Sequence, residues 1–127
     1  MSVTPSESLA GGFRRLHADL VARLRGWDAP DAGQAEIRDA FLGHLARHPD
    51  AMAKAGPPAH FTAGTLVVNR SLDAVLLTHH RRAGLWLQFG GHFESSDLDV
   101  VATATREAEE ESGIPLLVEP DLIDLNR

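Results

Sequence analysis

The 127-residue chain is long enough for one hydrophobic core and one domain, and its 43% hydrophobic and 24% charged residues are ordinary for a globular protein. Cysteine is absent, which excludes disulfides, thiolate zinc sites and a cysteine nucleophile and favours a cytoplasmic location. The net charge of −6 argues against a nucleic-acid partner, and no apolar run approaches the roughly 20 residues that cross a bilayer, so we expect no membrane partner either.

The first part of the chain is predicted to be helical. Apolar residues recur at helical spacing along residues 6–26, and a second stripe of this kind spans residues 31–48. The Gly-Pro-Pro sequence at 56–58 then breaks any helix. We therefore expect a helical N-terminal extension over residues 1–58, with no chemistry of its own, and a separate domain over residues 59–127.

After this break the hydrophobic pattern changes to the period of a strand. Residues 61–69 and 74–80 are rich in β-forming residues and predict two strands joined by a hairpin turn. A third strand is expected at 85–89. We expect Gly90-Gly91 to end that strand and to open a loop.

A helix is predicted over residues 97–112. Ser96 and Asp99 fit a capping box at its start, and Gly113 supplies the signal for its end. Residues 114–119 predict a further strand. Strands followed by a helix in this order indicate an α+β fold.

The acidic side chains are concentrated toward the end of the chain. Residues 94–127 hold ten acidic and two basic side chains, whereas residues 1–93 hold eight acidic and ten basic side chains. Glu107, Glu110 and Glu111 have the spacing i, i+3, i+4, which puts them within roughly 100° of one helix face. Such carboxylates repel one another and oppose the helix dipole, so they form either a solvated acidic face or a cation site. Hard oxygen ligands of this kind suit Mg²⁺ or Mn²⁺ better than Zn²⁺.

The residues around these glutamates resemble the Nudix box, whose pattern is Gly, five residues, Glu, seven residues, then Arg-Glu-apolar-any-Glu-Glu-any-Gly-apolar. Residues 106–114, which read REAEEESGI, match the second half in full. In the first half, Asp97 follows Gly91 after five residues, where Glu is usual, and eight residues instead of seven separate it from Arg106. The resemblance covers roughly residues 60–127.

Similarity to the Nudix family implies a hydrolase that cleaves the pyrophosphate bond of a nucleoside diphosphate linked to another moiety, with Mg²⁺ (or Mn²⁺) as cofactor. It implies that Glu107, Glu110 and Glu111 bind the metal together with a backbone carbonyl of the Gly91 region. It also implies catalytic roles for Glu107, which is tied to activating water, and for Glu110. Arg106 would orient a box glutamate through an ion pair.

The fold that this resemblance implies is an α/β/α sandwich around a mixed sheet. Family domains continue for several strands and a helix beyond the box, so we expect the chain to be truncated at its C-terminus. One sheet face and an edge would then be exposed unless the N-terminal helices or a second subunit, as in a homodimer, cover them. The alternative function is a catalytically silent Nudix-like module that binds a nucleotide.

Several other side chains are candidates for binding substrate. Substrate phosphate could be contacted by Arg81 and Arg82, for which a solvated hairpin end is the alternative. His92, beside the double glycine, could face the site and bind substrate there. Trp86 could stack on a base, but we expect it to be a buried strand residue. Asp97 is interpreted as a helix-start residue and not as a metal ligand, because an acid is stabilised at the positive end of a helix.

Overall fold

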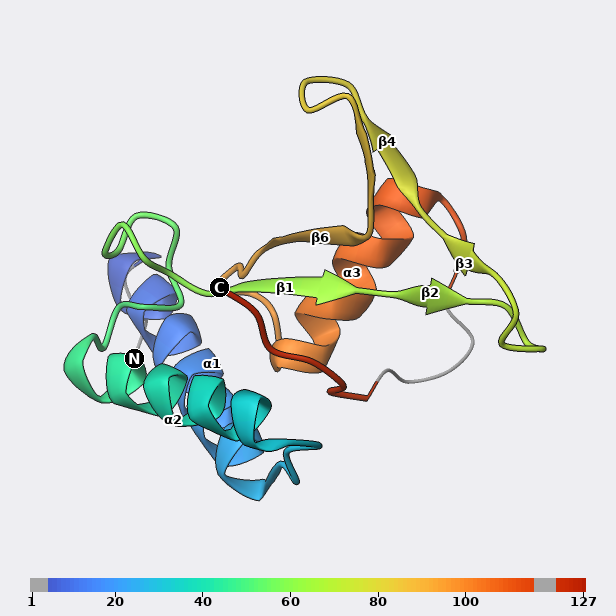
Figure 1. Ribbon diagram of the computed structural model, residues 1–127. Coiled ribbons are helices and arrows are strands. Elements are labelled where there is room, and N and C mark those ends of the chain that lie inside the picture. The colour runs from blue at the N-terminus through green and yellow to red at the C-terminus, as the bar shows by residue number, and fades with distance from the viewer. Residues whose placement is uncertain (1–4, 116–120) are drawn as a thin grey trace.

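Three helices and three pairs of short antiparallel strands are found in the computed structural model, which describes residues 5–115 and 121–127 (Figure 1). The helices are α1 (Pro5–Gly26), α2 (Ala32–Arg47) and α3 (Val100–Ser112). The two helices predicted in the first part of the chain are therefore confirmed. No helix among the described residues is long and apolar enough to cross a membrane.

The start of α3 is set by a side-chain cap. The Asp99 carboxylate accepts a hydrogen bond from the Ala102 N–H at 2.7 Å, so Asp99 is the N-cap and the helix begins at Val100. The predicted start at residue 97, with Ser96 as the capping residue, was therefore wrong. At the other end, Gly113 adopts the left-handed conformation (φ 71°) that stops the helix as predicted.

The strands are β1 (Thr62–Thr65), β2 (Val67–Val68), β3 (Val75–Leu76), β4 (Thr78–His80), β5 (Leu85–Leu87) and β6 (Phe89–His92). They form three antiparallel ladders, which pair β1 with β6, β2 with β3, and β4 with β5. Single residues (Leu66, Leu77 and Gln88) separate the strands that follow one another directly. The ladders therefore meet at one junction and diverge from it (Figure 1).

Gly90 and Gly91 lie inside β6, so the predicted break at these residues was wrong. Gly90 is paired with Gly64 of β1, and a Cβ at Gly90 would come within 2.8 Å of the Ala63 carbonyl oxygen. The missing side chains let the two strands approach closely. The double glycine thus joins β6 to β1 instead of ending the strand.

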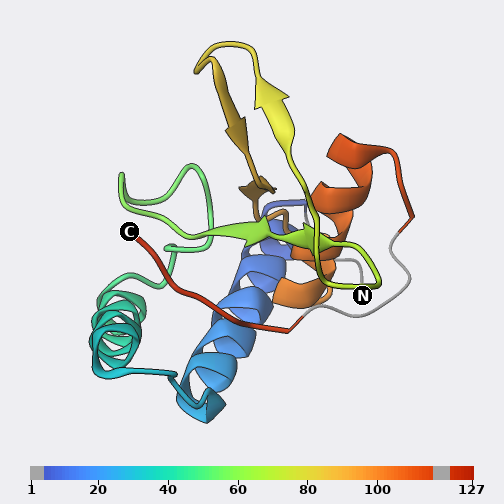
Figure 2. The same ribbon diagram turned by 45° about the vertical axis from the view of Figure 1, so that its right-hand side comes forward.

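Helix α3 packs on the β1–β6 ladder. The Thr65 hydroxyl of β1 donates a hydrogen bond to the Ala104 carbonyl of α3 at 3.0 Å, and Ala108 of α3 is fully buried. Helices α1 and α2 lie together beside this unit, and the β4–β5 hairpin stands away from it in both views (Figure 1, Figure 2).

The main hydrophobic core is formed by α1, α2 and the segment that follows β6. Phe93 from that segment and Leu125 near the C-terminus pack among buried residues of α1 and α2 and of the turn that follows α2, which are Leu16, Leu24, Leu45, Ala51 and Met52. The N-terminal helices therefore share a core with residues that follow the predicted division of the chain at 58/59. That division stays a prediction.

The two outer ladders expose apolar side chains. Trp86 of β5 is 66% exposed, and its ring lies 5.0 Å from the ring of its strand partner His79. Val75 and Leu85 are also more than half exposed. The expectation of a buried Trp86 was wrong, because the β4–β5 hairpin projects away from the helices (Figure 2).

The mixed helix and strand content confirms an α+β fold. Every strand pairing among residues 5–115 and 121–127 is antiparallel, and the α/β/α sandwich around a mixed sheet stays a prediction. The strand predicted at 114–119 falls largely on residues 116–120, which lie outside the described residues.

Candidate active site

Arg106 of α3 is the centre of a cluster of polar contacts on one side of the helix. Its Nε and Nη2 atoms donate to the two carboxylate oxygens of Asp97 at 3.0 and 2.9 Å, and its Nη1 atom donates to Glu107 at 2.9 Å. Nη2 also donates to the His92 carbonyl of β6 at 3.2 Å. The guanidinium group therefore joins the helix to the end of β6 and to the segment that follows it.

Asp97 is the principal partner of this arginine. Its side chain is only 6% exposed and accepts two further hydrogen bonds, from the Thr103 hydroxyl at 2.7 Å and from the Glu94 N–H at 2.9 Å. The Asp97 N–H in turn donates to the Glu94 carbonyl, which closes a tight turn over residues 94–97. The interpretation of Asp97 as a helix-start residue was wrong, since Asp99 caps α3 and the Asp97 carboxylate accepts hydrogen bonds from Arg106 and Thr103 instead.

The protonation of this pair follows from its contacts. Burial by itself would raise the pKa of the Asp97 carboxyl, but hydrogen bonds from Arg106, Thr103 and the Glu94 backbone, with the charge of Arg106, hold that pKa below its ordinary value of 3.8. The hydrogen bond to Asp97 raises the pKa of Arg106. Both groups are therefore charged at neutral pH.

Glu107 faces the strand that carries the double glycine. Its side chain is 15% exposed, and its carboxyl group lies so close to Gly91 that a Cβ at that position would overlap it. A residue other than glycine at position 91 would displace the Glu107 carboxylate. The structure thus brings together Gly91, Arg106 and Glu107, three of the residues singled out in the sequence.

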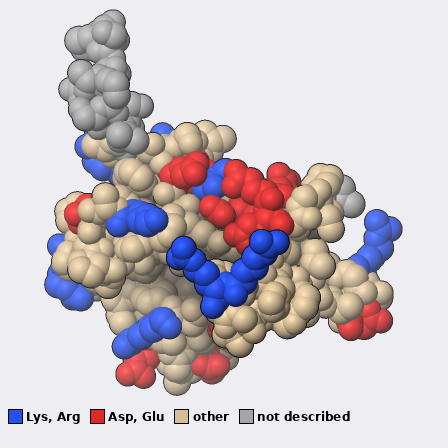
Figure 3. Space-filling model, turned by 90° about the horizontal axis from the view of Figure 1, so that it is seen from above, with Lys and Arg blue, Asp and Glu red and all other residues tan. Residues whose placement is uncertain are grey.

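Two more carboxylates reach the same guanidinium. Glu110 and Glu94 lie 3.5 and 3.6 Å from Arg106 Nη1, and their side chains are 62% and 60% exposed. Seen from above, acidic side chains crowd one face of the molecule next to basic ones (Figure 3). The carboxylates of Glu94, Glu107 and Glu110 therefore meet around one positive charge. Glu94 was missed in the sequence, where it lies in a segment expected to be a plain loop.

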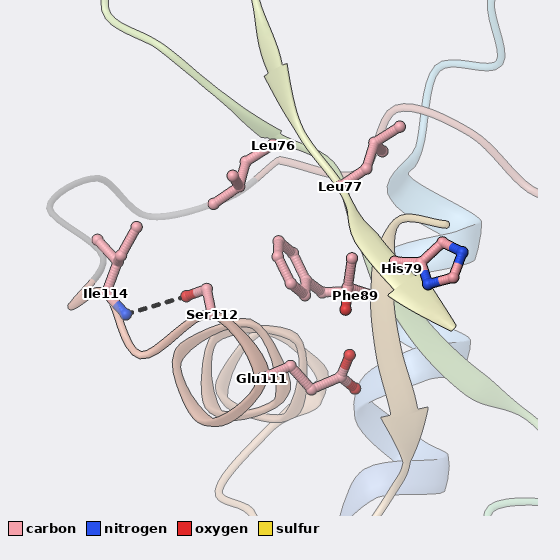
Figure 4. Close-up of a pocket in the computed structure, with 8 residues that line it drawn as sticks. Leu76, Leu77, His79, Phe89, Glu111, Ser112 and Ile114 are labelled. Atoms are coloured by element: carbon pink, nitrogen blue, oxygen red, sulfur yellow. Dashed lines mark hydrogen bonds between the residues drawn. The ribbon is translucent and has the colours of Figure 1, made fainter. Parts of the chain in front are cut away.

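Glu111 is directed elsewhere. Its carboxylate points toward Phe89 of β6, across a hollow of about 260 Å³ that is also lined by Leu76 and Ile114 (Figure 4). Within the described parts of the chain, no group of three or more His, Cys, Asp or Glu residues is arranged to hold a metal ion. The three glutamates predicted to act together are thus divided between two places.

Comparison with known proteins identifies the family. The family model described as the NUDIX domain matches residues 58–127, which is more than half of the chain. The chain belongs to the Nudix family. Membership indicates a hydrolase that acts on pyrophosphate bonds. No curated protein and no solved structure matches this chain.

The Nudix box of this chain departs from the usual pattern in two ways: it has Asp97 where Glu is usual, and it has one extra residue between that position and Arg106. Both departures are accommodated in the segment before α3. The tight turn over residues 94–97 brings the short side chain of Asp97 to Arg106, and the helix does not begin until three residues later, at Val100. The sequence signal for this contact was the position itself, since Asp97 occupies the place where the box has an acid.

The residues proposed to bind substrate are less closely grouped. His92 lies at the end of β6 next to Gly91, and its ring contacts His60 with nitrogen atoms 3.3 Å apart. Arg81 and Arg82 lie in the exposed turn between β4 and β5. The structure therefore places His92 within the Nudix box, next to Gly91, and the two arginines on the projecting hairpin.

Proposed function

We propose that this chain is a Mg²⁺-dependent Nudix hydrolase that cleaves the pyrophosphate bond of a nucleoside diphosphate linked to another moiety. The observation that carries the proposal is the convergence of Glu107 and Glu110 on Arg106 at one side of α3, where the Glu107 carboxyl group lies directly beside Gly91. Carboxylates that already share one cationic partner are suited to share a divalent ion.

The chemistry of these donors fits Mg²⁺. This ion keeps several of its waters and is commonly bound by one or two carboxylates together with substrate phosphates, so it does not need a complete protein cage. Glu107 and Glu110, with a backbone carbonyl of the Gly91 region, would hold it, and Glu111 is the predicted third ligand. When bound, the metal would neutralise phosphate charge and lower the pKa of a bound water.

Each box residue then has a defined role. Glu107 would accept the proton of the attacking water, and Arg106 would keep the Glu107 carboxylate in place through the 2.9 Å contact. Asp97 anchors Arg106 from its other side. The products would be a nucleoside monophosphate, or a similar phosphoryl fragment, and the remaining phosphate compound.

Substrate binding is proposed for His92 and for the β4–β5 hairpin. Arg81 and Arg82 are exposed and can donate hydrogen bonds to phosphate oxygens. The exposed Trp86 ring, backed by His79, offers an aromatic surface on which a nucleobase could stack. A homodimer and a cytoplasmic location stay predictions.

The proposal is tested by substitutions on α3. The full chain is incubated with Mg²⁺ and a panel of nucleoside-diphosphate compounds, and phosphate is measured after coupling to a phosphatase. Glu110→Gln and Glu111→Gln should each lower turnover on the order of a hundredfold, because several kcal/mol of charge stabilisation depend on the metal. Glu109→Gln removes the same charge from a different face of the helix and serves as the matched control. Near-wild-type turnover by both of the first two variants would refute the assignment.

The second candidate is a silent Nudix-like module that binds a nucleotide without cleaving it. Glu111 lines the hollow beside Phe89, whereas Glu107 and Glu110 contact Arg106, and this difference favours the candidate. It predicts that nucleoside diphosphates raise the melting temperature of the wild-type chain while no phosphate is released. Release of phosphate by the wild-type chain, lost in Glu110→Gln, decides against the silent module.

A further inference from the structure

Helix α1 contacts the segment between β6 and α3 directly. The Arg15 side chain donates hydrogen bonds to the carbonyl oxygens of Ser95 and Asp97 at 3.2 and 3.0 Å. One helical turn earlier, Gly12 lies against the Ser95 backbone, and a Cβ at Gly12 would overlap the Ser95 carbonyl. These contacts join residues about eighty positions apart, so they fix the position of the segment relative to α1.

The same helix also contacts the start of α3. The Asp19 carboxylate accepts a hydrogen bond from the Val100 N–H, the first residue of α3, at 2.9 Å. Arg23 holds Asp19 at 2.9 Å and approaches Asp99, the N-cap of α3, at 3.5 Å. A carboxylate at this end of a helix satisfies an amide that has no partner within the helix and complements the helix dipole.

These contacts connect α1 to Glu107 in three steps. Arg15 holds the backbone of Asp97, the Asp97 side chain holds Arg106 through two hydrogen bonds, and Arg106 holds Glu107 at 2.9 Å. Phe93, two residues before Ser95, is buried in the core that α1 forms. A shift of α1 would therefore move Asp97 and Arg106, and with them the carboxylate of Glu107.

We propose that α1, which lies outside the matched residues 58–127, is part of the catalytic unit, with Arg15 and Asp19 as positioning residues for the Nudix box. The proposal rests on the hydrolase function proposed above. Through these contacts α1 sets where Glu107 lies relative to Gly91, in addition to contributing residues to the hydrophobic core. Neither residue touches the reacting atoms, so both act through the contacts just described.

Matched pairs on α1 test the proposal. Gly12→Ala and Gly11→Ala make the same change at adjacent helical positions, but a Cβ at Gly11 meets only the end of the Arg14 side chain, at 3.8 Å. Arg15→Ala and Arg14→Ala form a second pair. We expect Gly12→Ala and Arg15→Ala to lower kcat by about ten- to a hundredfold with little change in KM, because small displacements of a positioned group have effects of this size. Gly11→Ala and Arg14→Ala should retain wild-type kcat.

Two further measurements separate positioning from folding and from the proposed function itself. Arg15→Lys keeps a donor at this site and should recover part of the lost kcat. The NMR signal of the Arg106 Nε–H, which donates to Asp97, should shift in Gly12→Ala and Arg15→Ala and stay in place in the two controls. If the wild-type chain cleaves no pyrophosphate, the hydrolase proposal fails while this signal still decides the positioning. Folded Gly12→Ala and Arg15→Ala variants with an unchanged signal would overturn the inference.

Discussion

Replacing Asp97 with Asn tests the contact on which the box geometry depends. The substitution preserves the shape of the side chain but removes its charge and one of its two acceptor oxygens. Asp97 is 6% exposed and accepts four hydrogen bonds, two of them from Arg106. Breaking one partner of a buried ion pair costs about 3–5 kcal/mol. Because Arg106 keeps Glu107 and the His92 carbonyl as partners, we expect the lower end, a loss of about 3 kcal/mol in the free energy of unfolding.

The loss should depend on pH in a defined direction. The pKa of Asp97 in the folded protein lies below 3.8, its ordinary value, so the unfolded chain takes up the proton first as the pH falls. The stabilisation by Asp97 is therefore fully present well above pH 3.8 and disappears as the pH falls through the folded-state pKa. The difference between wild type and Asp97→Asn should be constant from pH 7 to about pH 5 and shrink below pH 4.

Urea unfolding followed by tryptophan fluorescence measures this difference, since the partly buried Trp27 donates its indole N–H to the Leu122 carbonyl in the folded state. Glu94→Gln is the control. Glu94 also contacts Arg106, but at 3.6 Å and with 60% exposure, so its replacement should cost at most about 1 kcal/mol. Equal stabilities of wild type and Asp97→Asn at pH 7, or a difference that persists unchanged at pH 3, would refute the reasoning.

Three further substitutions around α3 have expected effects on stability. Thr103→Val removes the buried hydroxyl that donates to Asp97 at 2.7 Å and should lower the free energy of unfolding by about 1–3 kcal/mol; a urea midpoint equal to that of wild type would contradict this. Asp99→Ala removes the N-cap and should cost about 1 kcal/mol, visible as a lower melting temperature. Gly113→Ala places a Cβ on a residue at φ 71° and should cost about 1 kcal/mol by calorimetry, whereas Gly26→Ala, at a position with open space, should not destabilise.

The parts of the fold that depend on local pattern could be predicted from the sequence. The apolar stripes of α1 and α2 and the stop at Gly113 are local signals, and the structure contains each of them. The role of Gly90-Gly91 is not local, because a glycine ends a strand or admits a close neighbour depending on what lies opposite. Here Gly64 lies opposite, 26 residues earlier in the chain. Sequence position alone gives no means of choosing between the two outcomes.

The candidate site could be predicted only in part, because its geometry also depends on residues that are distant in the sequence. Helical spacing places Glu107, Glu110 and Glu111 in one sector of α3, but the side chains follow their nearest partners, and Glu111 turns toward Phe89 while the other two meet Arg106. The contacts of Arg15 with the box could not be predicted, since they join a helix with no recognisable motif to carbonyl oxygens about eighty residues away.

The junction of the three ladders has a consequence for how this protein behaves at high concentration. Each ladder of the described strands contains only two strands, so none of them is flanked on both sides as a central strand of a wide sheet would be. Outward-facing amides and carbonyls on such strands are templates for intermolecular pairing, and here they accompany the exposed apolar side chains of Val68, Val75 and Leu85. Self-association should therefore begin at the β2–β3 and β4–β5 ladders, leaving the acidic face around Arg106 open to solvent.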